Sequence, residues 1–170
     1  MTLTAHLKTL LTLAVLSVLV LFGLTWGWSA ATSPFPKRAP AKACVPTSLQ
    51  PGDRVAAPKV TVSVYNSSSR VGLAERTMAS FEDQGFGPGK VGNAPKGTNV
   101  LYAQIWTADR KNPAVQLVIS RLGPRAHILE KPTLGPGVTV VVGTHFDKLV
   151  PGKSSVKVRT AATICSPPNP

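Results

Sequence analysis

Residues 60–86 change their hydrophobic period once, from that of a strand to that of a helix. Val60, Val62 and Val64 alternate with Thr61, Ser63 and Tyr65, as in a strand with one buried face. After a polar turn, a single helical face is marked at i, i+3, i+4 and i+7 by Ala74, Thr77, Met78 and Phe81. Gly85 followed by Phe86 is typical of a helix end at which an apolar residue folds back. The stretch predicts a strand, a turn and a helix.

A second unit of the same kind is predicted downstream. Residues 87–96 form a short strand or loop, because Pro88 and Pro95 interrupt them. Residues 99–106 alternate as a strand that places Val100, Tyr102, Gln104 and Trp106 on one face. The next helix has Asn112 as its N-cap and Pro113 at its first position, and it ends before Gly123. Its buried face is marked by Val115, Val118, Ile119 and Leu122.

Three further strands complete the predicted α/β (α+β) domain. Residues 127–129 suit a short strand, 138–143 form a nearly continuous apolar run typical of a central strand, and 156–160 alternate as a charged edge strand. The order β-α-β-β-α-β-β predicts a split βαβ sandwich with two helices on one sheet face and the other face partly open. A binding surface is expected on that open face or at the polar turn after the first strand.

An apolar run precedes this domain. Leu10–Trp28 holds 19 positions without a charged residue, long enough to cross a bilayer as a helix. Trp26 and Trp28 stand at its end, where aromatic rings favour the headgroup region. The expected organisation is a tail at 1–9, a transmembrane helix at 10–30 and a Pro/Ala/Lys-rich linker at 31–57. The folded domain then covers 58–150, an edge strand and disulfide tail cover 151–165, and 166–170 are disordered. The alternative is a signal peptide cleaved near Ser29, Ala30 and Ala31.

The flanking charges and the cysteines point to opposite orientations. Lys8 precedes the apolar run and Lys37, Arg38 and Lys42 follow it, which counted alone favours a cytoplasmic domain. Cys44 and Cys165 are the only cysteines, and a lone, widely spaced pair is either a disulfide in an oxidising compartment or two inert thiols. Neither lies in a segment suited to burying a free thiol, so we predict that Cys44 and Cys165 pair. A disulfide favours an extracytoplasmic domain.

The formal net charge of +12 favours anionic neighbours. The basic residues of the domain are scattered singly and do not form a run, which makes nucleic acid a poor partner. No spacing of His, Cys, Asp or Glu suits a metal, and no nucleophile–base–acid arrangement or carboxylate pair indicates catalysis. No cofactor, metal or enzymatic activity is therefore expected.

The polar turn holds the candidate binding residues, which are Asn66, Ser67, Ser68, Ser69 and Arg70. A turn that leads into a helix N-terminus can bind an anion or a glycan through free N–H groups and hydroxyls. It can equally serve only as a helix cap, without a ligand. Trp106 is similarly open to two interpretations, as a core residue or as an exposed platform on which a sugar stacks.

Two motifs resemble the LytR C-terminal domain family. The first comprises Val62, Val64, Asn66, Gly72, Leu73, Ala74, Gly85 and Phe86, and the second Val138, Val140, Val141, Gly143 and Phe146. The chain departs from the family pattern at Ser67 and Ser69, where glycine is frequent, and at His145, where aspartate is common. The resemblance covers about residues 58–150.

The resemblance implies a location more than a reaction. In this family the domain follows the catalytic domain of some wall-polymer transferases, and in actinobacteria it also stands alone behind one membrane anchor. It implies a single-pass protein with a cytoplasmic N-terminus and an extracytoplasmic, non-enzymatic binding or scaffolding module at the cell envelope. The expected partners are the bilayer, through Leu10–Trp28, and an envelope protein or an anionic wall polymer or glycan. A role as accessory regulator of a wall-polymer transferase is a further alternative.

Overall fold

The computed structural model describes residues 3–32 and 44–168. The chain divides into two units, residues 1–39 and 40–170, and each is described by itself. The predicted tail at 1–9 falls partly outside the described residues, as do residues 33–43 of the predicted linker and the last two residues of the chain.

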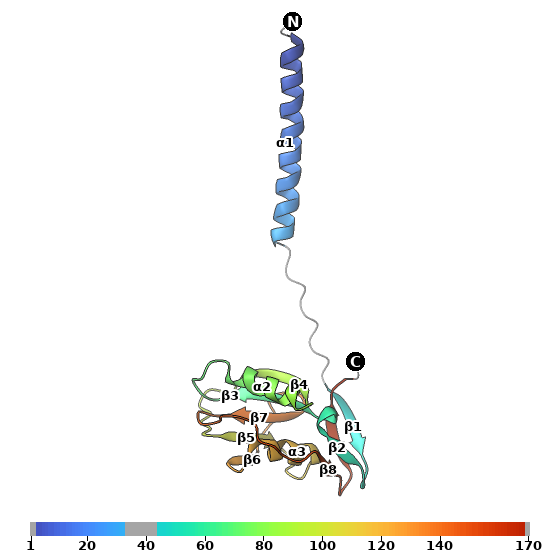
Figure 1. Cartoon of the computed structure of the whole chain (residues 1–170), viewed down its shortest axis with the longest axis vertical. Helices are drawn as coiled ribbons and strands as arrows, with labels where there is room; N and C mark the ends of the chain where they lie inside the picture. Colours follow the sequence, from blue (N-terminus) through green and yellow to red (C-terminus); the bar gives the residue numbers. More distant parts are fainter. Residues whose placement is uncertain (1–2, 33–43, 169–170) are drawn as a thin grey trace. The chain divides into compact units, whose positions relative to one another are not determined.

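The first unit is one helix, α1 (Leu3–Thr32) (Figure 1). Its stretch Leu10–Trp28 has a mean hydropathy of 2.2, and none of it is buried within the structure. A helix that is apolar on all sides and covered by no other part of the protein suits a lipid environment. By length and composition, α1 can cross a membrane.

The second unit is built on a five-stranded sheet of order β4-β3-β7-β5-β6 (Figure 1). One βα unit consists of β3 (Thr61–Asn66), α2 (Leu73–Asp83) and β4 (Gly87–Asn93). The other consists of β5 (Ala103–Thr107), α3 (Pro113–Leu122) and β6 (Ala126–Glu130), and β7 (Val138–Val142) lies between the two units. Strand β7 is parallel to β3 and antiparallel to β5. The α/β class and the element order are confirmed, but each helix connects neighbouring strands, so the βαβ units are not split.

Both helices cover one face of the sheet, as predicted. The alternating valines of β3 and β7 and the residues Ala103 and Ile105 of β5 form one core cluster with the buried faces of α2 and α3. Phe86 folds back onto α2 as expected, with its ring edge-on to Phe81 at a centroid distance of 5.3 Å. The side chain of Asn112 caps α3 by accepting a hydrogen bond of 3.0 Å from the N–H of Ala114.

The opposite sheet face is covered over its central strands β3 and β7, and it is open only towards the edge strand β6. Residues 131–137 lie over it: the Tyr65 hydroxyl donates to the carbonyl of Leu134, and the Ser63 hydroxyl donates to the carbonyl of Pro136. Together with Val100, Val141 and Trp106, Tyr65 forms a second, smaller buried cluster. Each of the residues of β3 and β7 is buried in consequence, whereas on the same face Gln104 of β5 is half-buried and its neighbour His127 in β6 is exposed.

Four short strands outside the main sheet, which we call the flanking strands, come from the two ends of the domain. Strand β1 (Val45–Leu49) pairs with β9 (Ala162–Ser166), and β2 (Arg54–Ala56) pairs with β8 (Ser155–Lys157). A short 3-10 helix, η1 (Ala57–Lys59), then leads into β3. The linker predicted at 31–57 is therefore wrong from Cys44 onward, because this segment pairs with strands that lie about 100 residues or more further along the chain.

Strand limits differ from the prediction at several places. Strand β8 borders β2 and not the main sheet, and Ser166 is the last residue of β9 and not part of a disordered tail. Strand β4 is an edge strand whose register with β3 shifts between Val62 and Val64, a position that tolerates Pro88. Strand β5 begins at Ala103, four residues later than expected, because residues 100–102 bend to meet residues 143–145.

Candidate functional site

The polar turn at 66–70 is closed by its own hydrogen bonds. The Asn66 side chain accepts from the N–H and the hydroxyl of Ser68, both at 2.8 Å, and donates to the carbonyl of Arg70 at 2.7 Å. The Ser67 hydroxyl donates to the carbonyl of Val142 at 3.1 Å. Asn66 is buried, while Ser69 is exposed. The side chains of Asn66, Ser67 and Ser68 thus fix the shape of the loop that leaves β3.

Arg70 fastens this turn to the neighbouring loop. Its guanidinium donates to the carbonyls of Phe146 and, at 3.3 Å, of Thr144. The N-cap of α2 is Gly72, which has a φ of 71° and makes no side-chain capping bond. The interpretation of the serines as helix caps is therefore wrong. Their donors already have acceptors within the protein, apart from the exposed Ser69, and anion or glycan binding at 66–70 stays a prediction.

The loop held by Arg70 also packs tightly against residues 100–102. The N–H groups of Gly143 and His145 donate to the carbonyls of Tyr102 and Leu101, at 2.7 and 2.6 Å. A Cβ atom on Gly143 would lie 1.9 Å from the carbonyl oxygen of Val100, so no larger residue fits without moving the backbone. The carboxyl ends of β3 and β7 thus carry a rigid group of three connected loops.

The surface of these loops is mixed in character. The Arg125 guanidinium lies 4.2 Å from the centre of the Tyr102 ring, and the His145 ring lies 5.8 Å from the same ring. Val71 and Leu101 are exposed, with 90% and 57% of their surface accessible. Two apolar side chains therefore project from loops that contact the same segment, 144–146.

Trp106 is a core residue and not a stacking platform. It is 5% exposed, its indole N–H donates to Gln104, and the Lys131 ammonium lies 4.6 Å from its ring. Burial beside it also raises the pKa of Tyr65 above the ordinary value. The side of the sheet away from the helices therefore has a structural role.

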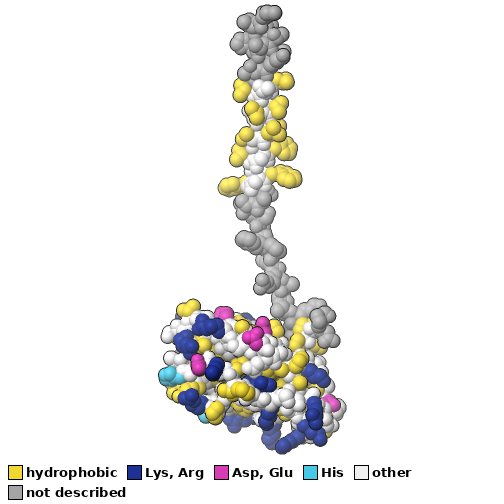
Figure 2. Space-filling view, in the orientation of Figure 1, with side chains coloured by type: hydrophobic (Ala, Val, Ile, Leu, Met, Phe, Trp, Pro, Cys, Tyr) yellow, Lys and Arg dark blue, Asp and Glu magenta, His cyan; other side chains and the backbone are white. Residues whose placement is uncertain are grey.

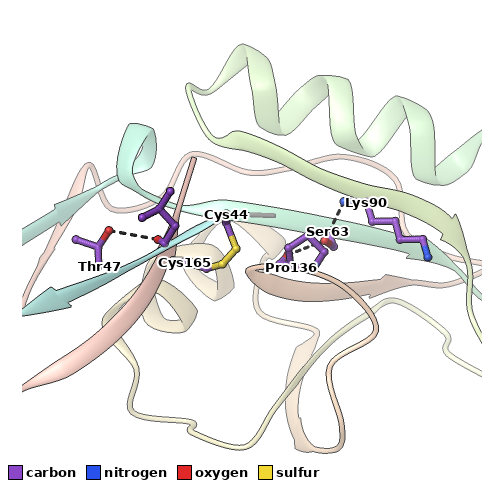
Figure 3. Close-up of a disulfide and its surroundings, with 7 residues drawn as sticks. Cys44, Thr47, Ser63, Lys90, Pro136 and Cys165 are labelled. Carbon is purple, nitrogen blue, oxygen red and sulfur yellow. Dashed lines mark hydrogen bonds between the residues drawn. A yellow bond between two sulfur atoms is a disulfide. The ribbon is translucent and has the colours of Figure 1, made fainter. Parts of the chain in front are cut away.

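The disulfide between Cys44 and Cys165 is present (Figure 3). It joins residues 121 positions apart, with a Cα–Cα distance of 5.3 Å. Cys44 immediately precedes β1, and Cys165 lies within β9 opposite Pro46. The predicted pairing is confirmed, and it closes the end of the β1–β9 pair.

A groove of about 670 Å³ lies where α3 meets β8 and the residues that follow it, and sequence reasoning missed it. Its cationic lining residues are Lys111, Lys153, Lys157 and Arg159, all exposed, and its other lining residues are Pro113, Gln116, Ser155, Val156 and Thr160. Figure 2 shows Lys and Arg side chains gathered along the lower edge of the domain, where Figure 1 draws β8. The signal was present in the spacing of Lys153, Lys157 and Arg159, but the opposing Lys111 lies more than 40 residues away and only the fold brings it near.

Metal-ligating side chains do not gather anywhere in the described part of the chain: it holds no group of three His, Cys, Asp or Glu residues able to share an ion. His127 and His145, the two histidines that follow the apolar run, lie at separate places, in β6 and after β7.

Comparison with known proteins gives the family. The model of the family described as LytR cell envelope-related transcriptional attenuator matches residues 59–146, about half of the chain. The chain belongs to this family. The resemblance drawn from the two motifs is thereby confirmed, and the domain is an envelope-associated type of module. Its family is that of the LytR C-terminal domain, which is distinct from the catalytic part of LytR proteins.

Curated proteins and solved structures do not extend this family assignment. Curated proteins gave no match. Among solved structures, the soluble domain of a conserved hypothetical secreted protein from Mycobacterium marinum is similar, with 23% identity and a TM-score of 0.49. The similarity covers 61% of this chain and 79% of that one.

The LytR C-terminal motifs map onto β3, α2 and β7 and the loops that follow them. Gly72 and Gly143 allow the turns after β3 and β7, and Asn66 closes the first of them. The matched residues end at 146, before Lys153, Lys157 and Arg159. One wall of the cationic groove therefore lies outside the residues that the family model matches.

Proposed function

We propose that this chain is a single-pass membrane protein whose α/β domain lies outside the cytoplasm and binds an envelope component without catalysing a reaction. The observation that carries the proposal is α1, in which none of the 19-residue apolar stretch is buried among the described residues. A chain that exposes so much apolar surface needs a lipid partner. The membership in an envelope-related family agrees with this placement.

The disulfide supports an extracytoplasmic domain. Reducing conditions in the cytoplasm keep such bonds rare, whereas they persist outside the membrane. Cys44 and Cys165 lie near the two ends of the folded unit, so the covalent bond between them ties the two termini of the domain together. This argument opposes the charge count across the apolar run, in which Lys37, Arg38 and Lys42 outnumber Lys8.

The topology is tested with a phosphatase reporter fused after Pro170 and with N-terminal sequencing of the mature protein. The proposal expects an active phosphatase in the membrane fraction and a retained N-terminal segment. An inactive reporter contradicts the extracytoplasmic placement. A soluble, active fusion that begins near Thr32 contradicts the anchor and indicates a cleaved signal peptide.

A protein partner is a second candidate for the binding role, favoured by Val71 and Leu101. Side chains as exposed as these are unfavourable in water, and neither contributes to the core. Crosslinking in intact cells, followed by purification of the full chain, tests this candidate. A partner lost from the double variant Val71→Ser/Leu101→Ser, at unchanged thermal stability, supports it. A partner retained by the variant places the contact elsewhere.

A further inference from the structure

The cationic groove beside α3 is formed by two parts of the chain, of which only one lies within the residues that match the family model. One wall holds Lys111, Pro113 and Gln116, which lie at the start of α3 within the family domain. The other wall, residues 153–160, lies outside the residues matched by the family. Hydrogen bonds hold the walls together: the Ser120 hydroxyl accepts from the N–H of Lys153, and Arg121 donates to the carbonyl of Lys153 at 2.8 Å. The groove is therefore a built feature of the folded unit.

The charges of the groove are not used by the rest of the described structure. Lys111, Lys153, Lys157 and Arg159 are exposed, and within residues 3–32 and 44–168 none of their side-chain nitrogens has a hydrogen-bond or ion-pair partner. The lining residues include no carboxylate. Four positive charges around one concave surface repel each other and raise the local concentration of anions. The groove is thus suited to a ligand that carries several negative charges.

The size and lining of the groove favour a linear polymer. A volume of about 670 Å³ exceeds the needs of one phosphate or carboxylate ion and admits several repeat units of a chain. No aromatic residue lines it, so it lacks the stacking surface on which neutral sugars bind. Gln116, Ser155 and Thr160 supply amide and hydroxyl groups that can hydrogen-bond to a polar backbone.

A membrane surface fits the groove less well. Lipid headgroups form a flat layer, whereas the cations surround a hollow. Interfacial binding also requires apolar side chains next to the basic ones. The large apolar residues exposed on the domain are Val45, Val71 and Leu101, and none of them lines the groove.

We propose that the groove between the start of α3 and residues 153–160 binds a linear polyanion of the cell envelope, with a phosphate or carboxylate group in each repeat. This inference rests on the proposed function for the polymer's presence, since the domain meets wall polymers only outside the membrane. Lysine and arginine bind both anion types, and arginine adds a planar pair of donors. The two polymer chemistries are separate arms of the test.

The test is a binding titration with the full chain in nanodiscs of neutral lipid. The probes are poly(glycerol phosphate), polygalacturonate, glycerol phosphate monomer and neutral dextran, each at low and at high salt. The groove variant is Lys153→Gln/Lys157→Gln/Arg159→Gln. The matched control is Lys59→Gln/Lys90→Gln/Lys96→Gln, which removes the same charge from exposed positions outside the groove.

The inference expects at least one polymer to bind and the monomer and dextran to bind far more weakly. The groove variant then loses about tenfold or more in affinity at low salt, while the control loses about threefold or less. Both variants should melt at the wild-type temperature, because the replaced side chains are exposed and unpaired. The preferred polymer identifies the anion.

Equal loss in both variants overturns the inference, because the polymer then follows only the net charge of the surface. The inference is also overturned if neither polymer binds. Stronger binding to anionic vesicles than to the polymers, dependent on the groove residues, overturns it as well. None of these results bears on membrane topology. A cytoplasmic reporter, in contrast, contradicts the proposed function even if the polymer binds in vitro.

Discussion

The five-stranded sheet and the flanking strands reach order by different means. The sheet buries every residue of β3 and β7 and packs both helices on one face. The flanking strands add few side chains to the core, chiefly Leu49, Val55 and Ile164, and a disulfide closes the end of the β1–β9 pair. The comparison teaches that the five-stranded sheet holds its shape by burial, whereas the flanking strands depend more on strand pairing and a covalent bond.

The largest contrast is expected from the same substitution placed in each region. Val140→Asp puts a carboxylate at a fully buried position of β7, where no partner is available, so the domain should not fold. Val45→Asp places it on β1 at a side chain that is 51% exposed, and stability should change by about 0.5 kcal/mol or less. Circular dichroism and thermal unfolding measure both. A folded Val140→Asp variant would contradict the burial account.

Removal of the disulfide tests the flanking strands. Cys44→Ser/Cys165→Ser should lower the free energy of unfolding by about 2–4 kcal/mol, because the unfolded chain loses a long closed loop. Hydrogen exchange should become faster in β1 and β9, while the amides of β3 and β7 stay protected at the level set by global unfolding. Uniform loss of protection, with no excess in β1 and β9, would show that the two regions unfold as one.

Asn66 and Ser69 allow a comparison of a buried and an exposed side chain within the turn that follows β3. Asn66→Ala removes three hydrogen bonds from a buried turn and should cost about 1–3 kcal/mol, since the Arg70 carbonyl loses its side-chain partner. Ser69→Ala changes an exposed side chain of the same turn and should cost about 0.5 kcal/mol or less. Chemical denaturation measures both variants. Equal costs would mean that the turn is not held by Asn66.

The smallest expected effect is confined to alkaline pH. Burial raises the pKa of Tyr65, so the folded state favours the neutral phenol. Above the ordinary tyrosine pKa of about 10, the unfolded chain releases its proton first, and stability falls until the folded phenol also ionises. Tyr65→Phe should remove part of this fall, together with the bond to Leu134. Identical alkaline profiles in both proteins would contradict the assignment.

Sequence patterns predicted the elements whose signals are local. The alternation of Val60, Val62 and Val64, the helical face of α2 and the cap at Asn112 each occupy a few successive turns or residues, and the structure places them as expected. The disulfide could also be predicted from the sequence, because two cysteines allow only one pairing.

Distant partners explain what the sequence did not reveal. Strand β1 contains Pro46 and only a weak alternation of apolar and polar residues, and it forms a strand by pairing with β9. The cover over the second sheet face depends on backbone carbonyls of Leu134 and Pro136, which carry no residue-type signal. The cationic groove needs Lys111 and Lys157 from opposite walls. Such features follow from the assembled fold, so the groove was harder to predict than the core.

Thiol trapping in intact cells tests the central claim, that an extracytoplasmic domain is closed by Cys44 and Cys165. Cells are treated with an alkylating reagent before lysis, and a membrane-impermeant lysine reagent labels the exposed side chains of the same protein. The account predicts no alkylated cysteine, together with labelling of domain lysines such as Lys153 and Lys157 in unbroken cells. Two alkylated cysteines, with lysine labelling only after permeabilisation, would place the domain in the cytoplasm and contradict the account.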